Sequence, residues 1–229
     1  MTTTDSAALS ILDFWFGPED APAYGHPRRE WFRKQEAFDA EIRARFEPLY
    51  REALSGDPPP MANAPSSGTV RHVARRRQAA GEPCGAQLPL HLLSWLERPP
   101  SALALIILLD QFPRNMFRDS AETFAADRLA LGAAQTAVRL GHDQSLLPVQ
   151  RVFVYLPFEH SEDIACQRRS LELFESLAPY PELANTIEFA RSHHDVVARF
   201  GRFPHRNRQL GRVNTSAEEE FLRQPGSRF

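Results

Sequence analysis

Apolar side chains recur at helical spacing along most of the chain. Residues 5–16 form the first such segment, and Asp5 or Ser6 is placed to cap it. Residues 31–54 form a longer segment with the same period and with Pro48 inside it. Both segments predict helices, and the proline should kink the second one.

The second half of the chain repeats this pattern. We expect helices over residues 92–96, 102–112, 125–140, 149–177 and 181–200, and a last one ending at Leu222. Residues 106–109 are apolar on every side, which predicts a central helix capped by Ser101. Pro157 either kinks its helix or begins a new one, with Glu159 in the favourable first turn. Thr215 with Glu218 has the spacing of a capping box.

The predicted class is all-α, with antiparallel helix pairs joined by short loops, because no segment has a convincing strand pattern. The 229 residues fit a single helical domain, 1–229. Residues 57–89 are rich in Pro, Gly and Arg and have no sustained period. They predict a disordered or irregular insertion within the domain. We interpret the arginine run at 71–77 as a solvated loop rather than a nucleic-acid site.

Composition and charge exclude several classes of function. The net charge of −2 gives no general attraction to nucleic acid or to an anionic membrane. The longest apolar run, 102–109, is far shorter than the roughly 20 residues of a membrane span. No signal peptide is apparent, so we expect a soluble cytoplasmic protein. Cys84 and Cys166 match no metal-ligand spacing, and we expect neither a metal nor a cofactor.

Positive charge is carried almost entirely by arginine, and residues 200–212 contain Arg202, Arg206, Arg208 and Arg212. Gly201 and Pro204 interrupt any helix there, which predicts a loop. Burying an unpaired guanidinium costs several kcal/mol, so inward-facing arginines of this loop need acceptors. Residues 110–115 and 158–163 contain suitable acceptors. We therefore expect these three segments to meet in one polar site.

Histidine and carboxylate side chains are the candidate catalytic groups. His160 continues the apolar line of its helix and should face inward, close in sequence to Glu159 and Asp163. His193 lies on the apolar line of the next helix, whereas His194 is rotated away from it. A histidine tuned by either acid could act as a general acid or base. The alternative is a structural interhelical histidine. The spacing disfavours a metal site.

The candidate ligand-binding residues are polar groups of the same segments: Asp110, Gln111, Arg114, Asn115, Arg199, Arg202, His205, Arg206, Asn207 and Arg212. In one interpretation, nearby acids, including Glu162 and Asp195, pair with these arginines and hold the loop to the helices. In the other, two or three guanidiniums remain free to bind a phosphate or carboxylate ligand. The two interpretations are compatible, since some arginines can be structural and others functional.

Four motifs resemble a known family. They are residues 13–17 (DFWFG), 103–115 (LALIILLDQFPRN), 155–163 (YLPFEHSED) and 199–207 (RFGRFPHRN) with 210–212. In this order they resemble the bacterial and eukaryotic family catalogued as domain of unknown function 924. The resemblance implies an all-helical fold similar to tetratricopeptide-repeat proteins, and it implies no agreed activity. Residues 57–89 depart from the family pattern.

Two functions of different classes are consistent with these residues. In the first, Arg202 and Arg206 bind a small anionic molecule while His160 or His193 moves a proton. In the second, a tetratricopeptide-repeat-like interaction module presents a concave groove to a peptide or protein partner, and its arginines receive an acidic segment. Polar groups mixed with Phe and Pro suit an enclosed site and favour the first. The sequence leaves open the ligand, the reaction and whether the protein is an enzyme.

Overall fold

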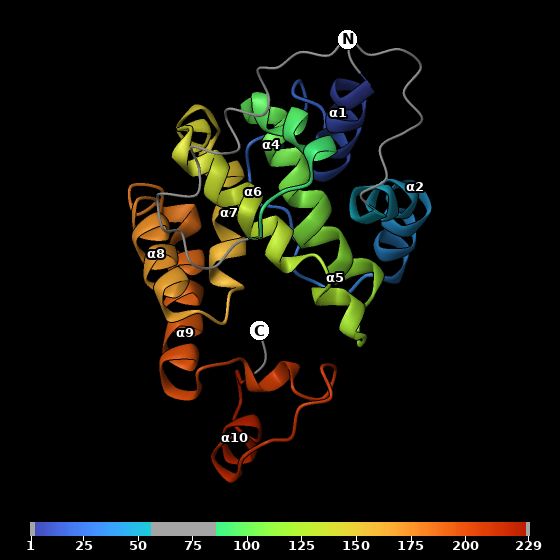
Figure 1. Cartoon of the computed structure of the whole chain (residues 1–229). Helices are drawn as coiled ribbons and strands as arrows, with labels where there is room; N and C mark the ends of the chain where they lie inside the picture. The colour runs from blue at the N-terminus through green and yellow to red at the C-terminus, as the bar shows by residue number, and fades with distance from the viewer. Residues whose placement is uncertain (1–2, 56–85, 228–229) are drawn as a thin grey trace.

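The structure is a computed structural model that describes residues 3–55 and 86–227, and its regular elements in these ranges are all helical (Figure 1). The α-helices are α1 (Thr3–Phe16), α2 (Glu36–Ser55), α4 (Pro99–Ile106), α5 (Phe112–Met116), α6 (Asp127–Arg139), α7 (Pro148–Glu159), α8 (Ile164–Glu175), α9 (Ala184–Phe200) and α10 (Ser216–Leu222). Short 3-10 helices are η2 (Leu90–Glu97), η4 (Ala121–Phe124), η5 (His142–Ser145), η6 (Pro181–Leu183) and η7 (Pro204–Arg206). The predicted all-α class is confirmed.

Helix α4 forms the centre of the core. Each residue from Ala102 to Leu109 is buried, as its uniformly apolar sequence predicts. Helix α4 packs against α1, α6 and α7, and the later helices pack in chain order, α6 on α7, α7 on α8 and α8 on α9. This order agrees with helix pairs joined by short connections. The likeness to tetratricopeptide-repeat proteins stays a prediction, as does the single-domain boundary.

Helix α2 begins later than the sequence predicts. Trp31 lies outside it, because the indole is buried beside Trp15 with the ring centroids 6.1 Å apart. Its Nε1 donates a hydrogen bond of 2.8 Å to the Trp15 carbonyl oxygen. Trp31 therefore continues the apolar spacing of α2 in the sequence but lies in the turn before it, where it packs on Trp15. Pro48 does lie inside α2, as expected.

Two predicted helix caps are wrong. Residues from Thr3 onward are already helical, so neither Asp5 nor Ser6 caps α1, and Asp5 lies in its first turn. Arg98 occupies the N-cap position of α4, and Ser101 lies inside that helix. The Ser101 hydroxyl donates to the Arg98 carbonyl oxygen at 3.1 Å. A proline-led first turn replaces the expected side-chain cap.

Helices α4 and α5 are joined by a π-helical turn, η3 (Ile107–Gln111), so the predicted helix at 102–112 extends from residue 99 to 116 with an interruption. A π-turn inserts an extra residue into the helical repeat and so rotates the side chains that follow. Asp110 and Gln111 lie in this turn and are 0% and 4% exposed. The turn therefore places two polar side chains inside the core.

Helix α7 continues through Pro157 and ends at Glu159. The chain leaves the helical path after His160, and α8 begins with Asp163 as its N-cap, which accepts from the backbone N of Ala165 at 2.7 Å. Of the two alternatives for Pro157, the structure shows the continuous helix, so Glu159 does not lie in a first turn. It is the last residue of a helix, where the helix dipole disfavours a carboxylate.

After α9 the chain forms a separate C-terminal segment, residues 201–227. Gly201 ends α9 in the left-handed conformation, with φ of 69°. The predicted capping box of α10 is confirmed, since Glu218 N donates to Thr215 Oγ1 at 3.2 Å and Thr215 N to Glu218 Oε2 at 2.7 Å. Phe203 packs with Val196 and Val197 in an apolar cluster distinct from the main core. Helices α1 and α10 lie at opposite ends of the molecule in Figure 1.

Most of the predicted insertion, residues 57–85, lies outside the described residues. Residues 86–89 have no regular structure but are packed on α6. Ala86 N donates to the Arg128 carbonyl oxygen at 2.9 Å, and Leu88 belongs to the main core.

None of the helices in the described ranges has the length and apolarity needed to cross a membrane.

Gly132 is required by this packing. A Cβ atom at Gly132 would lie 2.2 Å from the Ala86 carbonyl oxygen. Replacing glycine by alanine inside a helix normally stabilises it by about 1 kcal/mol. Here Gly132→Ala should instead lower the free energy of unfolding by about 1–3 kcal/mol, through overpacking. Urea denaturation measures the change, with exposed Arg128→Ala on the same helix as control. A stabilised Gly132→Ala variant would contradict the close approach.

Candidate functional site

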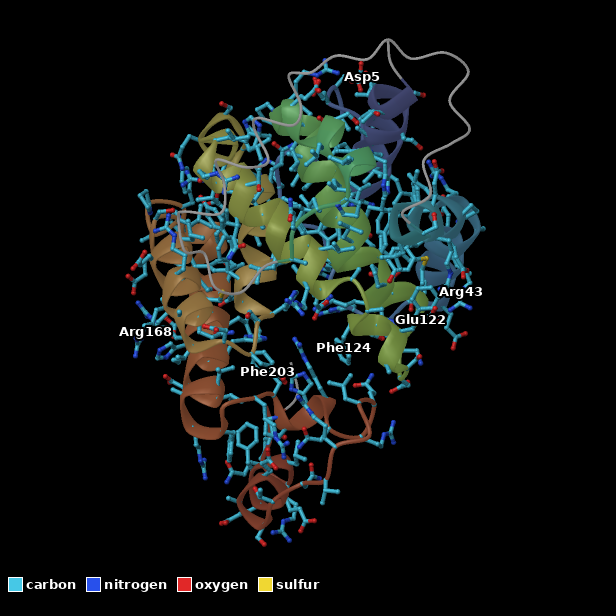
Figure 2. All side chains as sticks on the ribbon, in the orientation of Figure 1. Asp5, Arg43, Glu122, Phe124, Arg168 and Phe203 are labelled. Carbon is cyan, nitrogen blue, oxygen red and sulfur yellow. The ribbon has the colours of Figure 1, made fainter. Side chains whose placement is uncertain are left out.

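The three segments expected to form a polar site do converge, where the main helices contact the C-terminal segment. We call this group the polar cluster. It consists of Asp110, Arg114, Asp127, Glu159, His160, His193, His205 and Arg206. Figure 2 labels Phe124 and Phe203, which mark the place where the two parts of the molecule meet. The roles of these residues stay predictions.

Asp110 and His160 form a carboxylate–imidazole pair. Asp110 Oδ1 lies 2.8 Å from His160 Nδ1, and Oδ2 accepts from Gln111 Nε2 at 2.6 Å. Burial opposes ionisation of Asp110, but the charge of Arg114 and the contact with His160 lower its pKa below the usual value. An ionised carboxylate only accepts, so His160 Nδ1 carries the hydrogen. Burial, followed by the charge of Arg114, lowers the pKa of His160, which leaves Nε2 of the neutral ring as an acceptor.

Arg114 connects the π-turn to the start of α6. Its Nη1 and Nη2 donate to Asp127 Oδ1 and Oδ2 at 2.9 and 3.1 Å. Nη1 also donates to the Asp110 carbonyl oxygen at 2.7 Å. Arg206 reaches the same Asp127 carboxylate with Nη1, at the longer distance of 3.4 Å. Two cations thus share one carboxylate, and Arg114 takes the better geometry.

Arg206 is a buried cation whose donors are only partly used. Its side chain is 7% exposed, and Nε is buried with no hydrogen-bond partner within the described part of the chain. The guanidinium carbon lies 4.7 Å from the ring centroid of Phe124 and 4.5 Å from that of Phe203. Burial lowers the pKa of Arg206 to about 10, so the group remains charged at neutral pH. Burial without full pairing is costly for a guanidinium.

Glu159 and His193 form a second pair, at the end of α7 and on α9. Glu159 Oε1 lies 3.3 Å from His193 Nδ1, and Nδ1 donates to the Phe189 carbonyl oxygen at 2.8 Å. Burial, followed by the charge of Asp110, raises the pKa of Glu159 well above the usual carboxyl value. Burial lowers the pKa of His193 to about 3. His193 is therefore neutral at neutral pH, and burial favours the protonated form of Glu159. The choice of His193 over His194 as the inward histidine agrees with their burial.

Two of the candidate arginines are already paired with carboxylates. Arg202 donates from Nε and Nη2 to Glu218 at 2.6 and 2.8 Å. Arg212 donates from Nη1 and Nη2 to Glu162 at 2.6 and 2.8 Å, and from Nε to Asn207 Oδ1 at 2.8 Å. These bidentate pairs hold the C-terminal segment together and to the loop before α8. The geometry therefore assigns Arg202 and Arg212 to structure.

Other predicted site residues lie away from the polar cluster or have structural partners. Asn115 donates to Asp39 Oδ1 on α2 at 2.8 Å. Asn207 is buried and donates to Asn214 Oδ1 at 2.8 Å. Asp163 is the N-cap of α8. Arg199 is exposed, with its guanidinium carbon 4.7 Å from the Phe200 ring centroid. These side chains have the partners just named, and their roles in ligand binding or catalysis stay predictions.

Sequence reasoning missed Asp127, Phe124 and Glu218. Asp127 is the first residue of α6 and could have been recognised as an acid at a helix start, but nothing in the sequence directs it toward Arg114 and Arg206. Glu218 was interpreted only as part of a capping box, and it also binds Arg202. Within residues 3–55 and 86–227, no three His, Cys, Asp or Glu side chains are grouped as a metal site.

The family model described as "Bacterial protein of unknown function (DUF924)" matches residues 11–226. The chain belongs to this family. A solved structure of a protein of unknown function from Agrobacterium tumefaciens has 37% sequence identity to it and a TM-score of 0.69. The similarity covers 96% of this chain and 98% of that one. A comparison with curated proteins finds no match. Family membership confirms the resemblance of the four motifs and assigns no activity.

The buried histidines should make the folded state less stable in mild acid. Burial lowers the pKa of His193 and of His205 to about 3, and the pKa of His160 is also lowered. Above the pKa of histidine in the unfolded chain, about 6.5, the imidazole is neutral in both states and the fold keeps its full stability. Below that pH the unfolded chain binds a proton that the folded state does not, so stability is lost as the pH falls toward the lowered pKa. Each histidine should cost up to about 1.4 kcal/mol per pH unit.

Urea denaturation between about pH 7 and pH 5 tests this expectation. His193→Gln should make the loss of stability with falling pH shallower by about one proton, because the variant no longer has a group that is protonated only in the unfolded chain. His26→Gln, at an exposed position, should leave the slope unchanged. A wild-type free energy of unfolding that is flat across this range would contradict the neutral state of the buried histidines.

Proposed function

We propose that the polar cluster binds a small anion at Arg206 and that His160, oriented by Asp110, acts on it as a general base. The single observation that carries this proposal is the unused donor of Arg206. A buried cation with an unsatisfied Nε–H is expensive to keep unless a ligand completes its hydrogen bonds. An anion would supply the acceptors that the donors of Arg206 lack.

The geometry of His160 supports the second half of the proposal. In known acid–base sites a carboxylate holds the imidazole in one tautomer, and the opposite nitrogen exchanges the proton. Asp110 contacts Nδ1 of His160, so Nε2 is the nitrogen available for that role. The side chain of His160 is 13% exposed, against 1% for Asp110. The base is thus the more accessible member of the pair.

The interaction-module alternative is less well supported. An acidic peptide bound by a tetratricopeptide-repeat-like groove would need exposed arginines. Arg206 is buried, and the half-buried Arg202 and Arg212 already bind carboxylates of the same chain. These inward orientations favour a small ligand over a peptide or protein partner.

Replacing Arg206 by methionine separates a binding role from a structural one. Arg206→Met removes an incompletely paired buried charge and leaves Asp127 paired with Arg114. The free energy of unfolding should therefore stay unchanged or rise by up to about 2 kcal/mol. Stabilisation of the wild type by acetate or by inorganic phosphate, measured as a shift in Tm with each salt separately, should disappear in the variant.

Arg208→Met is the matched control, because the Arg208 side chain is 84% exposed. Its ion pair, at 3.6 Å, is with the exposed carboxylate of Asp119. The variant should keep the anion-dependent shift. A loss of more than about 2 kcal/mol in Arg206→Met would show that the guanidinium is structural, in conflict with the proposal. An anion-dependent shift that persists in Arg206→Met would place the binding elsewhere.

The base proposal makes a separate prediction about the His160 ring. At neutral pH its ¹⁵N spectrum, assigned by loss of the signal in His160→Gln, should show a protonated Nδ1 and an unprotonated Nε2. In Asp110→Asn the lost carboxylate should shift the population toward the other tautomer. Exposed His26 serves as the internal reference. A wild-type His160 with both nitrogens protonated at neutral pH could not act as a base.

A further inference from the structure

Four arginines of this chain show how it binds carboxylates. Arg118 and Arg202 use the side-on edge of the guanidinium, formed by Nε and Nη2. Arg118 donates to Asp39 at 2.6 and 2.9 Å, and Arg202 donates to Glu218 at 2.6 and 2.8 Å. Both edges present two parallel N–H groups to two coplanar oxygens, the arrangement that matches a carboxylate.

Arg114 and Arg212 instead use the end-on edge, formed by Nη1 and Nη2. Arg114 donates to Asp127 at 2.9 and 3.1 Å, and Arg212 donates to Glu162 at 2.6 and 2.8 Å. Nε of Arg212 is also satisfied, by Asn207. Each of the four guanidiniums therefore holds one carboxylate by two hydrogen bonds.

Arg206 differs from all four. Its hydrogen bond to Asp127 comes from Nη1, at 3.4 Å, and so leaves the side-on edge untouched. Nε, one of the two donors of that edge, is buried without a partner. No carboxylate of residues 3–55 or 86–227 forms an ion pair with this edge. The guanidinium carbon contacts the rings of Phe124 and Phe203, which leaves the side-on edge as the group of Arg206 that still lacks a polar partner.

The charges around Arg206 limit the ligand further. Electrostatic interactions link Arg206 to Asp127, Arg114, Glu162 and Asp110. Arg212, paired with Glu162, brings the local count to three cations and three carboxylates, a neutral set. Glu159 ends α7 nearby, so this helix presents its negative end to the cluster. Binding a singly charged anion would give this neutral set a net charge of minus one. A dianion would double that net charge.

We infer that the anion is the carboxylate of an organic acid, bound side-on by Nε and Nη2 of Arg206 beside the rings of Phe124 and Phe203. This inference rests on the proposed function, which requires only that some anion bind at Arg206. The free side-on edge, which holds a carboxylate in Arg118 and in Arg202, and the neutral surroundings together favour a singly charged, planar group over phosphate or sulfate. The two rings are also suited to the apolar part of an organic acid.

The test compares monocarboxylates with tetrahedral anions on the full chain. Acetate, propionate and benzoate, and separately inorganic phosphate and sulfate, are titrated at one ionic strength and neutral pH, with Tm as the first measurement. The second is the Nε–H signal of Arg206 in a ¹H–¹⁵N spectrum, assigned by its absence in Arg206→Lys. The carboxylates should raise Tm and shift this signal, and phosphate and sulfate should do neither.

The Arg206→Lys variant tests the shape of the contact. Lysine keeps the positive charge but lacks two parallel N–H groups, so carboxylate affinity should fall at least about tenfold. Undiminished affinity in this variant would overturn side-on binding. Arg208→Lys is the control and should bind as the wild type does.

The remaining outcomes separate the two proposals. If phosphate or sulfate raises Tm and shifts the Arg206 signal while the carboxylates do not, the inference about carboxylates is wrong and the proposed function survives. If no anion of either kind changes Tm or the Nε–H signal, the proposed function fails and the inference fails with it.

Discussion

Asp110 is an ionised carboxylate with no exposed surface, and the arrangement of the site follows from that one charge. A buried carboxylate requires both a counter-charge and hydrogen-bond donors. Arg114, four residues along, provides the counter-charge. Gln111 and His160 lie within hydrogen-bond distance of the two Asp110 oxygens. Each partner comes from a different turn or helix, so compensating the charge also fixes how α5 and α7 meet.

Pairing extends from Asp110 through Arg114 and Asp127 to Arg206, where it is incomplete. Arg114 is shared between Asp110 and Asp127, and Asp127 must then serve Arg206 as well. Arg206 is therefore left with one long contact, whereas Arg202 and Arg212 at the edge have full bidentate partners. A purely structural network would gain by replacing the weakly paired Arg206 with an apolar side chain. The proposed binding role accounts for a buried arginine at this position.

Much of this arrangement could be predicted from the sequence. The cost of burying guanidiniums requires that the loop at 200–212 meet acids from elsewhere, and helical spacing identifies His193 as the inward histidine. Three features could not be predicted. The π-turn that buries Asp110 depends on core packing rather than on local preference. The helix ends after Glu159 instead of at Pro157, and Asp127 acquires its partners only through the tertiary fold.

Two buried carboxyl groups of the cluster differ in protonation, and the difference limits what His160 can do. The charges of Arg114 and His160 lower the pKa of Asp110 despite its burial, whereas burial, followed by the charge of Asp110, raises the pKa of Glu159 well above the usual carboxyl value. Environments that separate the pKa values of two acids in this way give them different roles. Asp110 can orient an imidazole, while Glu159 can only hold or donate a proton. A base at His160 would thus act beside a reserve of one proton in a site whose charges otherwise cancel.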